Sequence, residues 1–279
     1  MSGRRIRHPD AADLRHGFAP RLLLVPAVLG LALLIVPLTA LVGRVDWSTL
    51  WADITSPEAL SALGLSVLTG AIATCVCIVL GVPLALLIAR AEHRLAAVLR
   101  AVVIVPLVLP PMVGGVALLF LLGRNGWLGR LLADVGVTLP FTTAAVVIAQ
   151  TFVALPFLVL ALEGSLRGAG TGYEHAAAAL GAGRWRILWR VTLPLVAPGL
   201  LAGIVLCFAR AIGEFGATAL FAGNAPGVTQ TMPLAIYTAF NGAGIGQSTA
   251  VALSLLLLGT AIAVLLLVRA WRPAAEVAA

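Results

Sequence analysis

The chain has 279 residues, of which 61% are hydrophobic and only 10% are charged, with a formal net charge of +7. Soluble domains carry roughly a quarter of charged residues, so this composition excludes an ordinary water-soluble protein and favours one embedded in a lipid bilayer. All 18 basic residues are arginines, and most lie between apolar runs. That distribution is typical of a membrane-orientation signal and not of a surface that binds nucleic acid.

Six apolar runs are long enough to cross a bilayer, which takes about 20 residues of helix. They cover residues 22–42, 63–89, 101–122, 141–162, 195–220 and 248–268. We therefore predict an all-α membrane protein with about six transmembrane helices over residues 22–268. Residues 1–21 precede this domain and residues 269–279 follow it. Prolines and glycines inside the runs are compatible with spanning helices, because neighbouring helices and waters satisfy the freed backbone groups.

The arginines also predict the orientation of the spans. They are concentrated in residues 1–21, in the connections after the second and fourth runs, and in residues 269–279. All of these segments lie on the same side if the chain has six spans. Because arginine-rich segments stay in the cytoplasm, both termini are predicted to be cytoplasmic.

The residues that carry catalysis or bind metals in other proteins show no such pattern here. The sequence contains no lysine, so it has no Walker A motif, and any ATP hydrolysis must occur on another polypeptide. Its histidines are scattered without metal-ligand spacing. Cys75, Cys77 and Cys207 lie inside apolar runs, where we interpret them as packed side chains. We predict a transport subunit that is not an enzyme and holds no metal or cofactor.

The connection over about residues 163–194 contains an alanine-rich segment that we predict to be a short helix. Glu174 lies in its first turn, where the helix dipole favours a negative charge. Alanines, among them Ala176 and Ala177, form a face that another surface can approach closely. Gly181 is able to take the left-handed conformation common at helix ends. From these residues alone, an ordinary solvated helix is as good an interpretation as a docking helix.

This segment resembles the EAA loop in the permease subunits of binding-protein-dependent ABC importers. The matching residues are Glu174, Ala176, Ala177, Gly181, Leu193 and Pro194, whereas His175 stands where the family usually has alanine. The resemblance implies that the short helix docks onto a separate ATPase subunit, which binds ATP and Mg, and transmits its closure. It also implies the ABC importer permease fold.

The fifth apolar run contains two ionisable residues, Arg210 and Glu214, four positions apart. On a helix they face one another and can pair. Ionisable groups inside a span are costly, so such a pair is a candidate functional site. An ion pair that only orients the helix, or a proton relay in a secondary transporter, would use the same residues. Gly213 and Gly216 favour a close helix approach or a kink near a gate.

The same run resembles the ARxxGEFG segment of molybdate, tungstate and sulfate permeases. Residues 223–238 are most similar to the molybdate type, and residues 106–111 and 122–126 also fit that family. The resemblance implies a transport path and gate formed by Arg210, Gly213, Glu214, Phe215, Gly216 and Thr218.

The predicted function is the permease subunit of an ATP-driven molybdate importer in the bacterial cytoplasmic (inner) membrane. The resemblance implies a homodimer, two ATPase subunits, and an extracytoplasmic oxyanion-binding protein that delivers the ion. Import of sulfate, thiosulfate or tungstate is an alternative within the family. A proton-coupled secondary transporter, which would depend on Glu214 and need no ATPase, is an alternative outside it.

Overall fold

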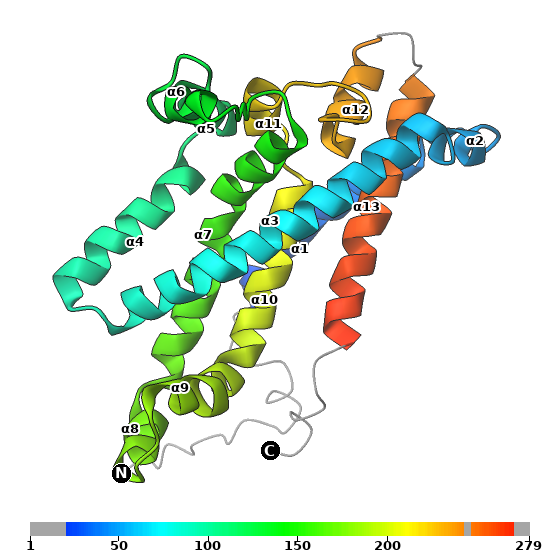
Figure 1. The fold of residues 1–279 in the computed structure, drawn as a ribbon. Helices are drawn as coiled ribbons and strands as arrows, with labels where there is room; N and C mark the ends of the chain where they lie inside the picture. Colours follow the sequence, from blue (N-terminus) through cyan, green and yellow to red (C-terminus); the bar gives the residue numbers. More distant parts are fainter. Residues whose placement is uncertain (1–20, 243–246, 271–279) are drawn as a thin grey trace, which may run out of the picture. The chain divides into compact units, whose positions relative to one another are not determined.

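The computed structural model describes residues 21–242 and 247–270, and all regular elements in this part of the chain are helices (Figure 1). The residues up to Val45 form a unit of their own, with a 3-10 turn η2 (Arg21–Leu23) and the helix α1 (Leu24–Val42). No residue of α1 is buried within the chain. Its 19 residues give a length of about 28 Å, close to the thickness of the hydrocarbon core.

The second unit starts at Asp46 and is built around three long helices. These are α3 (Pro57–Arg90), α7 (Thr143–Ala169) and α10 (Leu193–Ile212), which pack closely on one another. The shorter elements are α2 (Leu50–Ile54), α4 (His93–Val108), α5 (Pro111–Leu122), α6 (Trp127–Asp134), α8 (Gly172–Ala179), α9 (Arg184–Ile187), the π-helix η3 (Leu188–Thr192), α11 (Gly216–Phe221), α12 (Met232–Phe240) and α13 (Gln247–Ala270).

Within this unit the short helices lie at two opposite ends. Figure 1 shows α5, α6, α11 and α12 together at one end, called here the α12 end, and α8 with α9 at the other, the α8 end. The long helices connect the two ends. α3 begins where Pro57 occupies the first helical position and the Ser56 side chain accepts a hydrogen bond from Ala59 N, a cap that contributes about 1 kcal/mol.

The predicted continuous span over residues 101–122 is wrong, because the chain bends there by 109° between α4 and α5. Leu109 and Pro110 both have extended backbone angles. Consecutive prolines explain the bend: each lacks an N–H, and a residue that precedes proline is disfavoured in the α conformation. Pro111 then starts α5 at a position where proline is favoured.

The predicted span over residues 195–220 is also interrupted. α10 ends at Ile212, residues 213–215 are not helical, and α11 begins at Gly216. The predicted connection over residues 163–194 is shorter than expected, because α7 continues to Ala169, and α8, α9 and η3 fill most of the remainder. The connection after residue 221 contains α12, which packs against α3 and α13 through Met232, Ala235 and Ala239.

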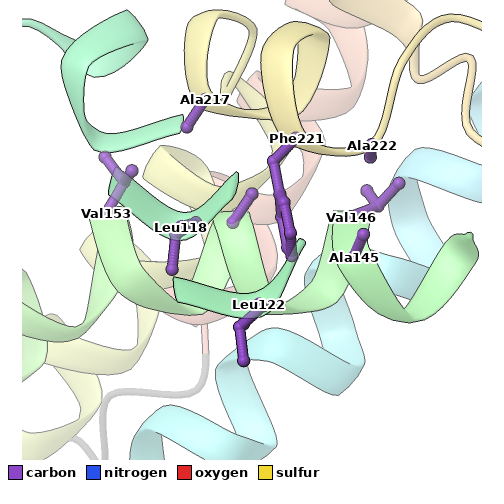
Figure 2. Packing of buried hydrophobic residues seen from close by; sticks show 9 residues of the cluster. Leu118, Leu122, Ala145, Val146, Val153, Ala217, Phe221 and Ala222 are labelled. Atoms are coloured by element: carbon purple, nitrogen blue, oxygen red, sulfur yellow. The ribbon is translucent and has the colours of Figure 1, made fainter. Parts of the chain in front are cut away.

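Buried side chains hold each end of the unit together. At the α12 end, Figure 2 shows Phe221 of α11 beside residues of α5 and α7, in a cluster of small and medium apolar side chains. At the α8 end a second cluster joins α3, α4, α7 and α10, with Ile88, Val159 and Leu162 fully buried. Much of the remaining apolar surface is exposed, as expected of helices that face lipid.

The number of spans and their orientation remain predictions. Within the described residues, four helices are long and apolar enough to cross a membrane, or five if the bent pair α4 and α5 counts as one span. The sixth predicted span falls in α13, whose apolar segment Ser248–Val264 is shorter than the other four.

Candidate functional site

The alanine-rich segment after α7 forms the short helix α8, as predicted. Glu174 lies in its first turn, followed by Ala176 and Ala177. Gly181 has a φ of +82°, a left-handed conformation that favours glycine, and its N–H donates to the Ala178 carbonyl at 2.9 Å. The helix therefore ends where the sequence indicated. Most of the alanine side chains are exposed, so α8 presents a surface of small residues.

Glu174 connects α8 to two long helices. Its Oε1 accepts a hydrogen bond from the Arg90 guanidinium at 2.5 Å and another from Thr192 Oγ1 at 2.7 Å. Arg90 is the last residue of α3, and Thr192 is the last residue of η3, directly before α10. Hydrogen bonds to a charged group are about twice as strong as neutral ones. The Glu174 carboxylate therefore joins α8 to the C-terminus of α3 and to the residue directly before α10.

The other two predicted coupling residues lie in the first turn of α10. Leu193 is half-buried and Pro194 is exposed. Pro194 follows η3 inside a helical segment that runs unbroken from Arg184 to Ile212, so its missing N–H leaves one intrahelical hydrogen bond unmade there. The preceding η3 is a π-helix, a rare conformation that often marks a functional site. The Glu174–Thr192 contact thus brings the six predicted coupling residues into one region.

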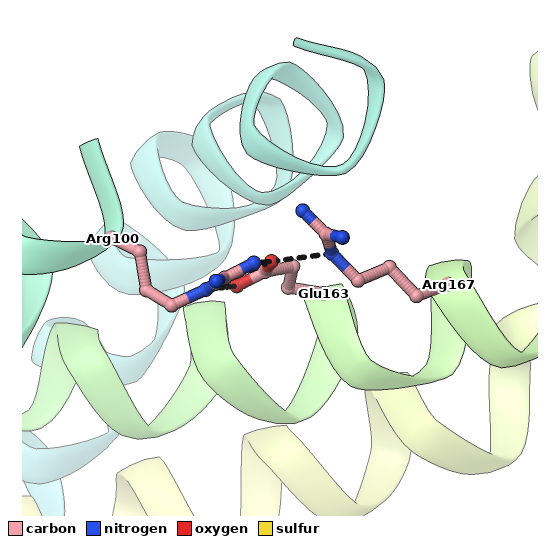
Figure 3. Close-up of polar contacts among 3 residues, drawn as sticks. All are labelled: Arg100, Glu163 and Arg167. Atoms are coloured by element: carbon pink, nitrogen blue, oxygen red, sulfur yellow. Dashed lines mark hydrogen bonds and ion pairs between the residues drawn. The ribbon is translucent and has the colours of Figure 1, made fainter. Parts of the chain in front are cut away.

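An ionic cluster lies between α4 and α7 (Figure 3). The Glu163 carboxylate is 4% exposed, and it accepts hydrogen bonds from Arg100 of α4 and from Arg167 Nε at 2.7 Å. The Arg100 Nε lies 3.2 Å from both carboxylate oxygens. A buried carboxylate is tolerated when charged donors satisfy it. This cluster was not predicted, although the spacing of four between Glu163 and Arg167 is a signal for a pair on one helix face.

At the opposite end of α10, the predicted pair between Arg210 and Glu214 is confirmed. The Arg210 guanidinium and Glu214 Oε2 are 2.7 Å apart, although α10 ends at Ile212, between the two residues. Glu214 Oε1 accepts a hydrogen bond from Ala217 N at 2.8 Å. Arg210 thus lies at the C-terminus of α10 and Glu214 at the N-terminus of α11, the positions that each helix dipole favours. The pair bridges the break between the helices.

Glycines allow α11 and α5 to pack at backbone distance. A Cβ atom placed on Gly216 would lie 3.1 Å from Met112 N, so the predicted close approach at Gly216 is present. A Cβ atom on Gly115 of α5 would lie 2.8 Å from both the Cα and the carbonyl oxygen of Ala217. α5 and α11 each begin directly after a non-helical interruption of an apolar run, so the two interruptions lie close to one another. The role of Gly115 was not predicted from the sequence.

The remaining predicted gate residues surround this contact. Gly213 lies in the break itself and has no close neighbour from another helix, so it fits the predicted kink and not the predicted close approach. The Phe215 ring packs against the Tyr237 ring of α12, with centroids 5.0 Å apart. Thr218 is fully buried, and its hydroxyl has no hydrogen-bond partner among the described residues.

In the described part of the chain no three His, Cys, Asp or Glu side chains cluster together. The main features of the site are the small-residue helix α8, the ionic cluster of Arg100, Glu163 and Arg167, and the helix breaks before α5 and α11.

The broken helices α4–α5 and α10–α11, and the alanine-rich α8 held by contacts to α3 and η3, fit a permease subunit of an ABC-type importer. The family of binding-protein-dependent transport system inner membrane components matches residues 81–272, and the chain belongs to this family. It is a multi-pass transport subunit of the bacterial cytoplasmic membrane.

Several relatives cover most of the chain. The molybdenum transport system permease protein ModB of Mycobacterium tuberculosis is 52% identical over 91% of this chain and 95% of the relative. The protein of the same name from Escherichia coli is 40% identical over 78% of this chain and 94% of its own length. The sulfate transport system permease protein CysT of Escherichia coli is 34% identical over 74% and 75% of the two chains.

Solved structures share the fold at low sequence identity. A chain of a bacterial alginate ABC transporter, in complex with an alginate pentasaccharide-bound periplasmic protein, aligns with a TM-score of 0.72 and 16% identity over 92% of this chain and 94% of that one. A chain of the inward-facing MetNI methionine ABC transporter aligns with a TM-score of 0.60 and 20% identity over 77% and 99%. These similarities establish the ABC importer permease fold.

Proposed function

We propose that this chain is the permease subunit of an ATP-driven importer of molybdate. The assignment of the substrate rests on the 52% identity, over nearly the whole chain, to a molybdenum transport permease. The similarity to a sulfate permease is weaker and covers less of the chain. Molybdate and sulfate are both tetrahedral oxyanions, so one path can serve either ion, and sulfate is the main competing substrate.

The proposed assembly contains two copies of this chain, two ATPase subunits that bind ATP and Mg, and an extracytoplasmic oxyanion-binding protein. The arginine distribution favours six spans with both termini in the cytoplasm. In that orientation the α8 end faces the ATPase subunits and the α12 end faces the binding protein. The family to which the chain belongs uses separate binding-protein and ATPase partners, which supports this arrangement.

The contacts within the chain supply a route from ATP hydrolysis to the gate. Closure of the ATPase subunits displaces α8, and the Glu174 carboxylate carries this displacement to Thr192 at the start of α10. The other end of α10 holds the Arg210–Glu214 pair, which joins it to α11. α11 packs tightly on α5, so both broken helices move together. The path consequently alternates between inward-facing and outward-facing forms.

The electrostatics of the gate suit rapid passage of an anion. Arg210 is 25% exposed and supplies a positive charge, while Glu214 is buried directly beside it. Because the pair carries no net charge, an oxyanion that passes it meets a dipole and not a deep electrostatic trap. Selectivity then comes mainly from the binding protein, since a tight site in the permease would slow release.

A proton-coupled carrier would need Glu214 to bind and release protons during transport. Its Oε1 accepts a hydrogen bond from Ala217 N, and its Oε2 lies 2.7 Å from the Arg210 guanidinium as an ion pair. The carboxylate therefore has a structural role in joining α10 to α11. This arrangement supports the ATP-driven mechanism over the secondary transporter.

The substrate is tested by competition in proteoliposomes that contain this chain, its ATPase subunit and its binding protein. We expect uptake of radiolabelled molybdate to persist in a large excess of sulfate or thiosulfate. Uptake abolished by excess sulfate would assign the chain to sulfate import. If tungstate abolishes uptake and sulfate and thiosulfate do not, the transporter accepts molybdate and tungstate. The affinities of the binding protein then determine which of these two ions is imported.

A further inference from the structure

An apolar cavity of about 400 Å³ lies between α3, α4 and α7. Only apolar residues line it, namely Leu84, Val102, Val103, Val105, Pro106, Phe152, Leu155 and Pro156. Val102 is 63% exposed and Val105 is 50% exposed, so the cavity opens at the side of the helix bundle. In a membrane protein this opening faces lipid or another transmembrane surface. None of the predicted coupling or gate residues lines the cavity.

The ionic cluster of Arg100, Glu163 and Arg167 lies along the same groove. On α7, Glu163 is two helical turns and Arg167 three turns beyond Pro156, so all three share one face of the helix. On α4, Val103 is one turn from Arg100. Glu163 is therefore about 10 Å and Arg167 about 16 Å along the helix axis from the cavity. One leaflet of the hydrocarbon core is about 15 Å thick. A single lipid molecule can therefore contact both the ionic cluster and the cavity.

The cluster has an excess of positive charge. Two guanidinium groups share a single carboxylate, and the Arg100 and Arg167 side chains are 36% and 47% exposed. Arg167 uses only Nε to bind Glu163. Figure 3 shows its two terminal nitrogens pointing away from the carboxylate. These donors are available to a phosphate, which guanidinium groups bind well.

We propose that the groove between α4 and α7 is a binding site for an anionic phospholipid, with its phosphate at Arg167 and Arg100 and one acyl chain in the apolar cavity. Basic pockets between transmembrane helices on the cytoplasmic side are known to hold anionic headgroups. A second copy of this chain is a poorer occupant. If the twofold axis of a dimer passed through this groove, the cationic cluster would meet its own copy and like charges would repel.

This site rests on the membrane location of the chain and on the proposed orientation, and not on the identity of the transported ion. The lipid is therefore measured directly and not through transport. The complete transporter is placed in mixed micelles with equal amounts of phosphatidylglycerol and phosphatidylcholine that have identical acyl chains. Native mass spectrometry then counts the lipids that remain on each complex.

We expect wild-type complexes to retain one phosphatidylglycerol per copy of this chain, with an enrichment of about fivefold over phosphatidylcholine. Arg167→Gln should abolish the enrichment, whereas Arg190→Gln, the same charge change at an exposed arginine of η3, should preserve it. Val105→Trp should fill the cavity and reduce retention of both lipids. Val108→Trp, on the same helix but outside the cavity, is its control.

Equal retention of the two lipids by the wild type would overturn the proposal, as would equal losses in Arg167→Gln and Arg190→Gln. Release of the lipid by soluble inorganic phosphate would assign the site to a free anion. Disulfide formation between two copies of Val105→Cys would show that the groove is a protein interface. The uptake of molybdate can succeed or fail independently of each of these outcomes.

Discussion

Gly115→Ala is expected to reduce ATP-driven uptake at least about tenfold, because it separates α5 from α11. The new Cβ would lie 2.8 Å from the Cα and the carbonyl oxygen of Ala217. These are backbone atoms, so no side chain can rotate away and one of the two helices must move. Overpacking of this kind costs ~1–3 kcal/mol. Uptake by proteoliposomes, normalised to the amount of folded protein, measures the effect.

Gly114→Ala is a matched control from the same helix. Its Cβ would lie 2.9 Å from the Phe152 ring, which is a side chain that can rotate. Both substitutions gain up to about 1 kcal/mol in helix propensity, so their difference isolates the contact with α11. We expect Gly114→Ala to retain most of the uptake. Equal activity of the two variants would contradict a rigid contact between α5 and α11.

Reversal of either charge in the Glu174–Arg90 pair is expected to reduce ATP-driven uptake at least about tenfold, and the exchange of both charges to restore most of it. Glu174→Arg and Arg90→Glu each place like charges side by side where the wild type has an ion pair at 2.5 Å. In the double variant the opposite charges meet again. The Thr192 hydroxyl can accept as well as donate, so it retains a partner.

The exchange separates two roles for Glu174. If its carboxylate positions α8 within this chain, the double variant recovers, and the ATPase subunit remains bound in all variants. If the carboxylate instead acts by direct contact with the ATPase subunit, the double variant stays as inactive as Glu174→Arg. Arg94→Glu, an equal charge change at a nearby exposed arginine, should leave uptake close to the wild-type value.

The helix α8 was predictable because its signals are local. An acid in the first turn, a run of alanines and a glycine at the end each act within a few residues, and the structure places Glu174 and Gly181 as expected. The Arg210–Glu214 pair was predictable for the same reason, since four residues separate its members.

The contacts that connect the ends of the molecule were not predictable from a single sequence. Arg90 and Glu174 are 84 residues apart, and no local pattern indicates which of the arginines pairs with Glu174. Gly115 carries no sign of its proximity to Ala217, because that proximity depends on how α5 and α11 are placed.

The two interrupted spans show that average hydropathy does not reveal where a helix ends within an apolar run. Residues 101–122 and 195–220 are apolar throughout most of their length, so a window average joins the helices on either side of each break. Pro110 and Pro111 are visible in the sequence, but prolines are also compatible with spanning helices, so they do not by themselves indicate a break. At the break over residues 213–215, the Glu214 carboxylate accepts a hydrogen bond from Ala217 N in the first turn of α11, a contact that a window average does not register.

The central claim, that ATP hydrolysis drives an oxyanion through this chain, is tested most directly by the energy requirement of uptake. Proteoliposomes with the assembled transporter and molybdate-loaded binding protein receive hydrolysable ATP, a non-hydrolysable analogue, or an imposed proton gradient without nucleotide. We predict molybdate uptake only with hydrolysable ATP, and no change when a proton gradient is added. Uptake driven by the proton gradient in the absence of ATP would contradict the account.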